Sequence, residues 1–329
     1  MPHPTILTIV LNYKTAEMTL KAAKAARVAM EDLPGEIVIV DNDSQDGSFE
    51  TIDAHMRDHG WDRTRVIQSG RNGGYGAGNN VGIRAGLSDG SRPDYVYILN
   101  SDAFPKPDAI RILYEHLNTT PGTGFAGSFI EGEDEIQHTT TFRFPSISSE
   151  FEGSIHFGPV SKLLKSYRVP VELTKTTPVD WLAGASVMMR QDVLDEIGLF
   201  DETFFLYFEE TDLCRRAQNA GHRVMFVAES VVTHLGSVST GMKEWKRVPD
   251  YWFDSRWHYF TKNHGRAYAA CATIMHLIGG GLHLLRGKLT SKNNARAPYF
   301  LRTLLRHDAA ALFQFQRQRP SQPAPQIGE

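Results

Sequence analysis

The sequence has few cysteines and lacks the signals of several large protein classes. Its two cysteines, Cys214 and Cys271, are too few for a disulfide framework, so we expect a reducing compartment. No basic segment precedes the first apolar run, which argues against a secretory signal peptide. No register of the glycine-rich loop RNGGYGAGNN gives G-x-G-x-x-G, which removes the main support for a nicotinamide cofactor, and G-x-x-x-x-G-K-[ST] does not occur, which removes the support for a P-loop. With 41 % hydrophobic residues in 329, the chain can still build a large core.

Charge is distributed unevenly along the chain, although the formal net charge is only −3. Residues 256–329 contain eleven Lys and Arg residues against two acidic residues, a net charge of +9. Residues 1–255 contain 24 basic and 36 acidic residues, a net charge of −12. The asymmetry predicts a domain at 1–255 and a basic, helical C-terminal region at 256–329, each with its own partners. The Pro- and Gln-rich tail from Arg319 is expected to be frayed.

Strand and helix patterns alternate through the first hundred residues. The expected strands are Ile6–Leu11, Glu36–Val40, Arg65–Gln68 and Tyr95–Leu99. The expected helices between them are Ala16–Ala29, Ser48–His59 and one that begins near Gly78. Farther along, regular structure is expected at Val179–Met189, with helices near Gln191–Ile197 and Thr211–Ala220 and a strand at His222–Ala228. This order predicts an α/β fold with a mostly parallel sheet flanked by helices.

Polar residues follow each of the first strands, at the sheet edge where ligands bind in open α/β folds. They are Asn12, Asp41, Asn42, Asn100 and Asp102, together with the loop RNGGYGAGNN at 71–80. Asp, Asn and Gly also favour ordinary turns, which is the simpler interpretation of any one strand end. Polar residues at the ends of all four strands together favour one shared ligand-binding crevice. The glycines of the loop would allow its backbone to approach a ligand closely.

Asp102 is a candidate ligand for a divalent cation, because Mg²⁺ and Mn²⁺ favour carboxylate, phosphate and water oxygens. A second protein ligand is needed, and His234 is the best candidate because it follows the strand His222–Ala228 after a short turn. A lone histidine is more often structural than metal-bound, and only the companion motifs favour a metal here.

Three carboxylates lie close together at the start of a predicted helix, Glu209, Glu210 and Asp212, directly after the aromatic run FFLYF. Their simpler interpretation is a favourable interaction with the helix dipole. A carboxylate beside aromatic surface and other acids also has its pKa raised, as general-base catalysis requires. Glu209 and Asp212 share a helix face and Glu210 points elsewhere, so one can be the base while its neighbours hold the loop or the acceptor.

Taken in order, these motifs resemble the family 2 glycosyltransferases of the GT-A fold, over roughly residues 5–260. The resemblance rests on TIVLNYK, IVIVDNDSQDGS, RNGGYGAGNN and YILNSD, the last in the position of the family's D-x-D. It continues through DWLAGASVMMRQDVLDEIGLFDETFFLYFEETDLCRRAQNAGHRVMF to Thr233–His234. The block from Trp181 to Cys214 looks most like the rhamnosyltransferase-like branch.

The resemblance implies roles for individual residues. Asp102 would bind the metal and diphosphate, with Asn100 as its weaker partner and His234 completing the coordination of Mg²⁺ or Mn²⁺. Glu210 stands where the family usually has its catalytic Asp, which leaves Glu210 or Glu209 as the base. Asp41 would read the nucleotide base beside Asn72, and Trp181, Leu182 and Gly184 would border the sugar and acceptor. The full predicted nucleotide-sugar site is Asn12, Asp41, Asn42, Asn72, Gly73, Asn79, Asn100, Asp102, Trp181 and Gly184.

The implied activity is that of an inverting, metal-dependent glycosyltransferase. Its donor would be a nucleoside-diphosphate sugar and its acceptor a lipid-linked or polymeric saccharide, in cell-surface glycan synthesis such as that of O-antigen or cell wall. Rhamnose from dTDP-rhamnose is the prediction within that class, and another hexosyl or a galactofuranosyl donor is the alternative. A non-catalytic sugar-nucleotide-binding protein at the membrane is an alternative of another class. Nucleotidyl transfer lacks a motif of its own here.

The basic C-terminal region contains a stretch without charged residues at 267–285, just long enough to cross a bilayer. Gly279–Gly281, His276 and His283 argue against a stable spanning helix. The following leucines and arginines have the pattern of helices that lie on anionic membrane surfaces. We therefore expect a cytoplasmic protein, peripheral at the inner face of the cell membrane. Packing within the chain, a homo-oligomer and a span are alternatives. No nucleic-acid-binding module is recognised, so no nucleic-acid partner is expected.

Overall fold

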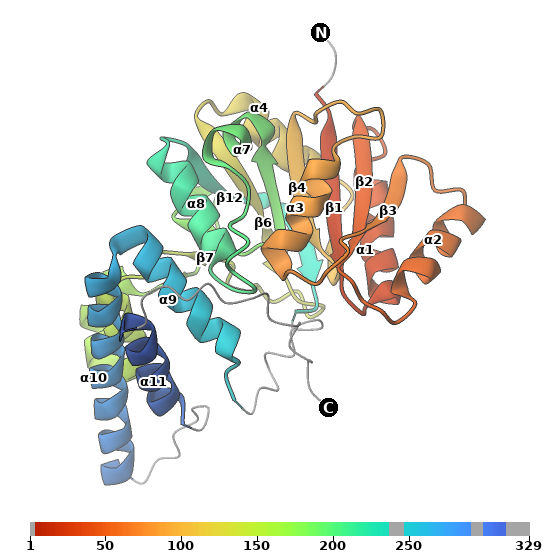
Figure 1. The fold of residues 1–329 in the computed structure, drawn as a ribbon. Coiled ribbons are helices and arrows are strands. Elements are labelled where there is room, and N and C mark those ends of the chain that lie inside the picture. The colour runs from red at the N-terminus through yellow and green to blue at the C-terminus, as the bar shows by residue number, and fades with distance from the viewer. Residues whose placement is uncertain (1–3, 237–246, 291–298, 314–329) are drawn as a thin grey trace. The chain divides into compact units, whose positions relative to one another are not determined.

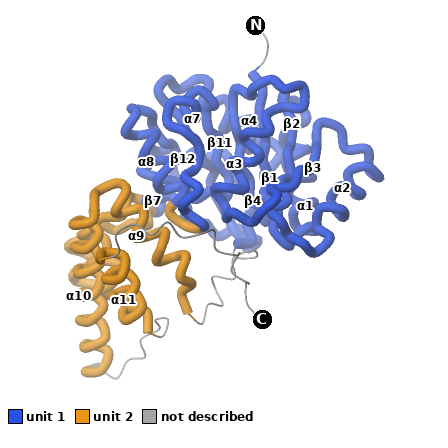
Figure 2. The backbone as a smooth tube through the Cα atoms, in the orientation of Figure 1, with its two compact units in different colours: residues 1–142, 172–205, 209–240 blue, residues 143–171, 206–208, 241–329 orange. Residues whose placement is uncertain are grey.

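The protein is described by a computed structural model with two compact units, each built from several chain segments (Figures 1 and 2). The described residues are 4–236, 247–290 and 299–313. Unit 1 comprises residues 1–142, 172–205 and 209–240, and unit 2 comprises 143–171, 206–208 and 241–329. Unit 2 therefore includes internal segments as well as the basic C-terminal region, whereas a single boundary after residue 255 was expected. The tail from Arg319 lies outside the described residues.

A mixed sheet forms the centre of unit 1. Its strands are β1 (Ile6–Asn12), β2 (Gly35–Asp41), β3 (Thr64–Gln68), β4 (Tyr95–Asn100), β5 (Ala103–Pro105), β6 (Thr123–Glu131), β9 (Thr177–Val179), β11 (Ser186–Arg190) and β12 (Arg223–His234). They run in the order β3-β2-β1-β4-β11-β6-β12-β5, with β9 also paired to β12. The first four strands of this order are parallel, β6 and β12 are parallel, and β11 is antiparallel to both its neighbours. The predicted mostly parallel α/β fold is confirmed.

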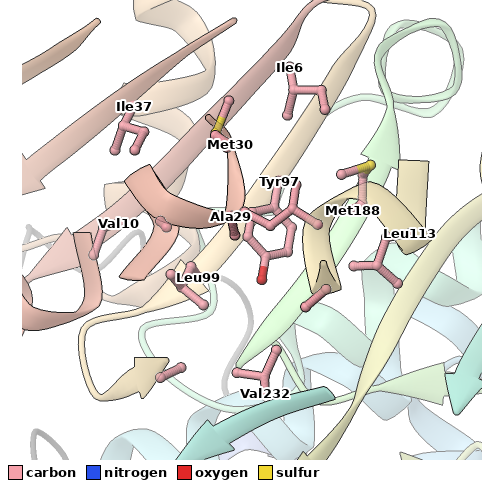
Figure 3. Packing of buried hydrophobic residues seen from close by; sticks show 14 of the residues in the cluster. Ile6, Val10, Ala29, Met30, Ile37, Tyr97, Leu99, Leu113, Met188 and Val232 are labelled. Carbon is pink, nitrogen blue, oxygen red and sulfur yellow. The ribbon is translucent and has the colours of Figure 1, made fainter. Parts of the chain in front are cut away.

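Helices cover both faces of this sheet. They are α1 (Ala16–Ala29), α2 (Ser48–Asp58), α3 (Tyr75–Ala85), α4 (Ala109–Thr119), α7 (Gln191–Ile197) and α8 (Glu209–Asn219). On one face, α1, α2 and α4 share a core with alternate residues of the strands, and Figure 3 shows Ala29 and Leu113 around Val10, Tyr97 and Met188. The opposite face carries α3 and α8. The helices predicted from about Ala16 to Ala29 and near Gln191–Ile197 are confirmed as α1 and α7.

Two stretches of unit 1 differ from the predicted pattern. The regular stretch expected at Val179–Met189 is broken, and its middle forms β10 (Trp181–Leu182), which pairs with β7 (Thr141–Phe142). The strand expected to end at Ala228 runs on as β12 to His234, with a register shift between Val227 and Val231. His234 is therefore the last residue of a strand and does not follow a turn.

Unit 2 is mostly helical in the part of the chain that the structure describes. Its elements are α5 (Ile147–Ile155), α6 (Gly158–Leu163), a 3₁₀ turn (Lys165–Tyr167), β8 (Pro170–Val171), α9 (Asp250–His264), α10 (Arg266–Thr290) and α11 (Phe300–Phe313). The predicted helical C-terminal region is confirmed. The uncharged stretch 267–285 lies within the continuous helix α10. On length and composition alone, Arg266–Leu289 is apolar enough to cross a membrane.

Candidate active site

Asn12 and Asp41 lie side by side at the carboxyl ends of β1 and β2, because the parallel register places them opposite each other. Asn12 Nδ2 donates a hydrogen bond to Asp41 Oδ1 at 2.7 Å, and Asn12 Oδ1 accepts one from Thr19 Oγ1 at 2.7 Å. The backbone N–H of Ser44 donates to Asp41 Oδ2 at 3.3 Å. Both Asn12 and Asp41 are buried. A network thus fixes this carboxylate at the sheet edge.

Asn42 joins the end of β2 to the glycine-rich loop. Its Nδ2 donates to Asn72 Oδ1 at 3.0 Å and to the carbonyl oxygen of Gly74 at 3.2 Å. Asn79, in the first turns of α3, donates from Nδ2 to the carbonyl oxygen of Tyr75 at 3.0 Å. The Oδ1 atoms of Asn42 and Asn79 are buried and accept no hydrogen bond from the described residues. Buried acceptors of this kind are normally satisfied, so both amides are available to a polar ligand.

The glycines of RNGGYGAGNN allow α3 to pack closely on its surroundings. Gly74 has φ +91°, and a Cβ atom there would stand 1.8 Å from the carbonyl oxygen of Phe205. A Cβ atom at Gly78 would stand 2.5 Å from Leu11 Cδ1 of β1. Gly73, a predicted nucleotide contact, immediately precedes the N-cap residue Gly74. The loop therefore brings backbone N–H groups at the start of α3 close to the ends of β1 and β2.

Asp102 and His234 meet at the other side of this edge. The antiparallel pairing of β12 with β5 places His234 opposite Ala103, beside Asp102. His234 Nε2 lies 3.0 Å from Asp102 Oδ1 and 3.4 Å from Asn100 Nδ2, and the carbonyl oxygen of Asp102 accepts from Leu235 N–H. The structure thus brings together the three residues predicted around the metal, and Asp102 is buried.

The donor set of Asp102 and His234 fits a divalent cation. A carboxylate oxygen is the kind of ligand that Mg²⁺ and Mn²⁺ favour, and an imidazole nitrogen is a ligand typical of transition metals, so the pair suits Mn²⁺ better than Mg²⁺. Oδ1 and Nε2 lie within hydrogen-bond distance of each other, at 3.0 Å, so the two atoms are close enough to ligate one cation together. Within the described residues, no group of three or more His, Cys, Asp or Glu side chains is placed to hold a metal. A cation here would therefore need further ligands from a diphosphate and water.

Glu210 lies in the first turn of α8 against the peptide groups of Gly184. The N–H of Gly184 donates to Glu210 Oε1 at 3.2 Å, and the carbonyl oxygen of Gly184 accepts from the Tyr75 hydroxyl at 2.7 Å. A Cβ atom at residue 184 would stand 2.3 Å from the Tyr75 oxygen, so this contact requires glycine. Tyr75, Gly184 and Glu210 therefore form one connected group.

Burial raises the pKa of the Glu210 carboxyl, although the hydrogen bond from Gly184 lowers it. The carboxyl adjoins a small cavity of about 20 Å³ whose apolar lining includes Ile98, Phe125, Leu182 and Leu213. The pKa of the Tyr75 hydroxyl is also raised, by burial and then by the charges of Glu210, Glu209 and, more weakly, Asp102. These three carboxylates consequently act on one phenol, which places the acidic helix start and the Asp102 pair in one electrostatic neighbourhood.

Glu209 and Asp212 are both buried, while Glu210 is half-buried. Asp212 Oδ2 accepts a hydrogen bond from Arg216 Nε at 2.9 Å within an ion pair. The Arg216 guanidinium also donates to the carbonyl oxygens of residues 197–199. Asp212 therefore holds Arg216 where it ties α8 to the end of α7.

Trp181 stacks on Phe142, with ring centroids 4.1 Å apart and an interplanar angle of 16°. The antiparallel pairing of β10 with β7 sets this contact, and Trp181 is half-buried. Sequence reasoning missed Phe142, Tyr75 and the hydrogen bond from Thr15 Oγ1 to Ser101 Oγ at 3.3 Å, which joins the residues after β1 and β4. An aromatic residue inside a glycine-rich loop was the available signal for Tyr75.

The aromatic residues of α9 are largely internal to unit 2. Phe253, Tyr259 and Phe260 are buried, and Tyr259 lies 5.5 Å from the Phe208 ring, centroid to centroid. Ser255 Oγ donates to the carbonyl oxygen of Leu206 at 3.0 Å. These three aromatic residues therefore pack inside unit 2.

The fold and the polar strand ends define the class of protein as a GT-A-type glycosyltransferase. Residues 5–198, more than half of the chain, match the family described as Glycosyl transferase family 2, and the chain belongs to that family. Among its relatives, an N-acetylglucosaminyl-diphospho-decaprenol L-rhamnosyltransferase of Mycobacterium tuberculosis is 29 % identical over 221 residues, which cover 63 % of this chain and 69 % of the relative. Rhamnosyltransferase WbbL of Escherichia coli is 28 % identical over 158 residues, covering 47 % and 58 %. These relatives confirm the resemblance to the rhamnosyltransferase-like branch.

Solved structures support the fold. Mannosyltransferase PcManGT from Pyrobaculum calidifontis, in complex with GDP-Man and Mn²⁺, has a TM-score of 0.53 at 14 % identity, covering 94 % of this chain and 86 % of that one. GalNAc-T7 with UDP, GalNAc and Mn²⁺ has a TM-score of 0.55 at 14 % identity, covering 94 % and 58 %. At these identities the likeness shows the GT-A-like architecture alone.

Proposed function

We propose that this family 2 glycosyltransferase is an inverting, metal-dependent enzyme that transfers rhamnose from dTDP-rhamnose to a hydroxyl of a lipid-linked or polysaccharide acceptor. The observation that carries the catalytic part is Glu210, a carboxyl with a raised pKa that Gly184 N–H holds beside Tyr75. The names of the Mycobacterium tuberculosis and Escherichia coli relatives support rhamnose, and the first name specifies a diphospho-decaprenol acceptor. The role is in cell-surface glycan synthesis.

The nucleotide would bind along the ends of β1 and β2 and the start of α3. Asp41, which Asn12 holds in place, would accept hydrogen bonds from N–H groups of the base. Amide groups from the side of the loop would come from Asn42, Asn72 and Asn79. The two buried Oδ1 acceptors without a protein partner support this assignment. Gly73 would let the loop backbone approach the phosphates.

Asp102 and His234 would hold Mg²⁺ or Mn²⁺ against the diphosphate, with Asn100 beside them. The cation supplies positive charge that offsets the negative charge gained by the departing nucleoside diphosphate. The position of the two side chains next to each other at the sheet edge supports this pairing, as does the Mn²⁺ in the two similar solved structures.

The chemical step is a single displacement. Glu210 removes the proton from an acceptor hydroxyl while that oxygen forms a bond to the anomeric carbon, and the bond from this carbon to the diphosphate oxygen breaks. Attack from the side opposite the leaving group inverts the anomeric centre. A base whose pKa is raised toward the working pH accepts the proton more readily than an ordinary carboxylate. Trp181 and Gly184 would border the sugar and acceptor, and the buried Glu209 and Asp212 would hold α8.

A thermal-shift panel of nucleoside-diphosphate sugars with Mg²⁺ or Mn²⁺ tests the donor, because a ligand of the folded state raises apparent stability. A thermal shift with dTDP-rhamnose supports the proposal. A shift only with another hexosyl donor or a galactofuranosyl donor would replace rhamnose as the proposed sugar. The absence of a shift with every donor would contradict the proposal. Release of the nucleoside diphosphate, lost on chelation, tests the metal. Donor binding without turnover on any acceptor would favour a non-catalytic binding protein. The proposed location is the cytoplasm, at the inner face of the cell membrane.

A further inference from the structure

One face of α10 packs against other helices of unit 2. Gly279 lies so close to α5 that a Cβ atom there would stand 2.1 Å from Ser154 Oγ. On the same helix, His276 Nδ1 lies 2.7 Å from Glu150 Oε2 of α5. A helix fixed by such polar contacts would have to give them up in order to cross a bilayer with lipid on all sides. The glycines and histidines of α10 therefore serve its packing.

The opposite face of α10 is apolar and exposed. Its residues, with their exposed fractions, are Ile274 (53 %), Ile278 (46 %), Leu282 (46 %), Leu285 (56 %) and Leu289 (78 %). They recur at intervals of four, four, three and four residues, as one face of an α-helix requires. Exposed Ala267 and Cys271 continue the row toward the start of the helix. We call this row from Ile274 to Leu289 the α10 apolar face.

The apolar surface is wider than a helix–helix seam. Leu284 is also exposed (40 %), and at about 100° per residue it lies roughly 160° around the helix from Leu282, with Ile278 and Leu285 between them. A two-helix coiled coil uses a narrower stripe, whereas a helix half-immersed in a bilayer presents about half its circumference. The width favours lipid over a second copy of the chain as the occupant of this face.

The charges around the α10 apolar face are positive. Exposed Lys262 and Arg266 precede it and exposed Lys288 lies at its end. Between residues 256 and 329 the acidic residues are Asp308 and Glu329, and Asp308 is buried in an ion pair with Arg256. Lys and Arg near a membrane surface are attracted by anionic lipid headgroups at about 1 kcal/mol each, and long basic side chains can extend out of the apolar layer.

We propose that the α10 apolar face docks on an anionic bilayer, with α10 lying parallel to the surface and its leucine and isoleucine side chains in the interfacial layer. The opposite face of the helix stays packed in unit 2. Docking would hold the enzyme where a lipid-linked acceptor is presented, and this consequence alone rests on the proposed function. In this arrangement the long apolar helix α10 lies in the plane of the membrane and does not cross it.

The chain carries a natural probe for this face. Cys271 is exposed on α10, whereas Cys214 is buried and burial raises the pKa of its thiol to about 12, so a thiol reagent will label Cys271 selectively. We expect bimane on Cys271 to shift to shorter wavelength with vesicles of phosphatidylcholine and phosphatidylglycerol, and to be quenched by nitroxides placed at shallow acyl positions. The control carries the label on exposed Glu50 of α2, as the Cys271→Ser, Glu50→Cys variant, and should show neither change.

Variants of the α10 apolar face give a second test. We expect Ile278→Asn, Leu285→Asn to lower the fraction that floats with these vesicles at least about tenfold, because each side chain loses apolar burial in lipid. Ile136→Asn, which replaces an exposed isoleucine of unit 1, should float like the wild type. Both variants should keep the donor-induced thermal shift, which reports folding and the sugar-nucleotide site independently of the membrane.

Two outcomes would overturn the docking proposal. The first is a wild-type enzyme that binds and turns over a sugar nucleotide but does not float with anionic vesicles. The second is a doubled mass in solution that the Ile278→Asn, Leu285→Asn variant abolishes, with the Cys271 label shifted in the absence of vesicles, which would assign the face to a second copy. Flotation without donor binding would instead contradict the proposed function and leave the docking face intact.

Discussion

Both units bury carboxylates, but they treat the buried charge in opposite ways. In unit 2 the Arg256 guanidinium, 1 % exposed, lies 2.9 Å from Glu150 and 2.9 Å from Asp308. His276 adds a contact to Glu150, and His307 adds one to Asp308 at 2.8 Å. In unit 1 the Glu210 carboxylate accepts a hydrogen bond from the backbone N–H of Gly184, beside an apolar cavity.

The pKa values follow this difference. Burial alone would raise the pKa of Glu150, but Arg256 and His276 lower it to about 2. Burial raises the pKa of Glu210, and among the described residues no comparable cation reverses the effect. A buried carboxylate with matched cations stays ionised and joins helices, whereas one without them is poised to exchange a proton. Burial by itself thus does not distinguish the structural acid Glu150 from the proposed base Glu210, but the charge of their surroundings does.

The largest expected effect comes from removing the poised proton acceptor. Glu210→Gln keeps the size and the hydrogen bond to Gly184 but cannot take a proton, so we expect turnover to fall by about 10²–10⁴-fold. Donor binding, measured by thermal shift, should be preserved. Glu209→Gln is the matched control, and near-wild-type turnover in Glu210→Gln together with its loss in Glu209→Gln would move the base to Glu209.

Arg256→Met tests the other half of the comparison. It leaves Glu150 and Asp308 buried without the guanidinium that they share, and loss of one partner of a buried pair costs about 3–5 kcal/mol. Because the chain has two units, the readout should be local, so we would measure amide hydrogen exchange in α9 and α10. Exchange in β1 and β4 is the internal control. Unchanged protection in α9 and α10 would show that the network contributes little to unit 2.

Loss of the same network by titration should be smaller and should appear on both sides of neutral pH. Glu150 has its pKa lowered from 4.5, so its stabilisation is present above pH 4.5 and is lost as the pH falls toward about 2. Burial alone would lower the pKa of His307, but Asp254 and Asp308 raise it from 6.5 to about 9. Its stabilisation is therefore present below pH 6.5 and is lost as the pH rises through about 9.

The measurement is hydrogen exchange in α9 to α11 across this pH range, in the wild type and in His307→Gln, with intrinsic exchange rates corrected for pH. The two proteins should differ most below pH 6.5 and converge above about pH 9. A difference that grows as the pH rises would reverse the assigned sign. Unit 1 offers the contrast, because Glu210 is expected to affect turnover rather than stability.

How much of the fold and of the candidate site could be predicted from the sequence depends on how far apart in the chain the contacting residues lie. Parallel strands end at one sheet edge, so the meeting of Asn12 with Asp41 followed from local patterns, and so did the strand–helix order. The choice between Glu209 and Glu210 could not be made from sequence, because it depends on Gly184, which lies 26 residues away in a broken strand region. The ionic network of unit 2 was missed because Glu150 and Arg256 are 106 residues apart, in a stretch with few regular signals.

Asp102→Asn sharpens the description of the acidic edge in unit 1. The variant keeps a polar side chain beside His234 but loses the only acidic group of that pair, so metal-supported donor affinity should fall by about 10–100-fold. Isothermal titration of donor with and without Mn²⁺ measures it. Asp43→Asn, which changes a half-buried acid just after β2, is the control. Equal metal dependence in Asp102→Asn and the wild type would remove Asp102 from the metal site.

The smallest expected effect concerns Tyr75, which positions Glu210 through Gly184. Tyr75→Phe removes the hydrogen bond to the Gly184 carbonyl, worth about 0.5–1.5 kcal/mol, so we expect a loss of about two- to tenfold in kcat with little change in donor KM. The hydrogen bond from Gly184 N–H lowers the pKa of Glu210, so this pKa should rise when Gly184 is held less firmly.

The pH profile separates this positioning role from a merely structural one. Because turnover needs the ionised Glu210, the rate rises as the pH rises through its pKa, and that acid limb should move to higher pH in Tyr75→Phe. Tyr75→Phe removes no charge near Glu210, because the pKa of the Tyr75 phenol is raised well above 10.0 and the phenol is neutral. A reduced kcat with an unmoved acid limb would mean that Tyr75 supports packing alone. The pKa of Glu210 would then depend on its apolar surroundings rather than on the hydrogen bond from the Gly184 N–H.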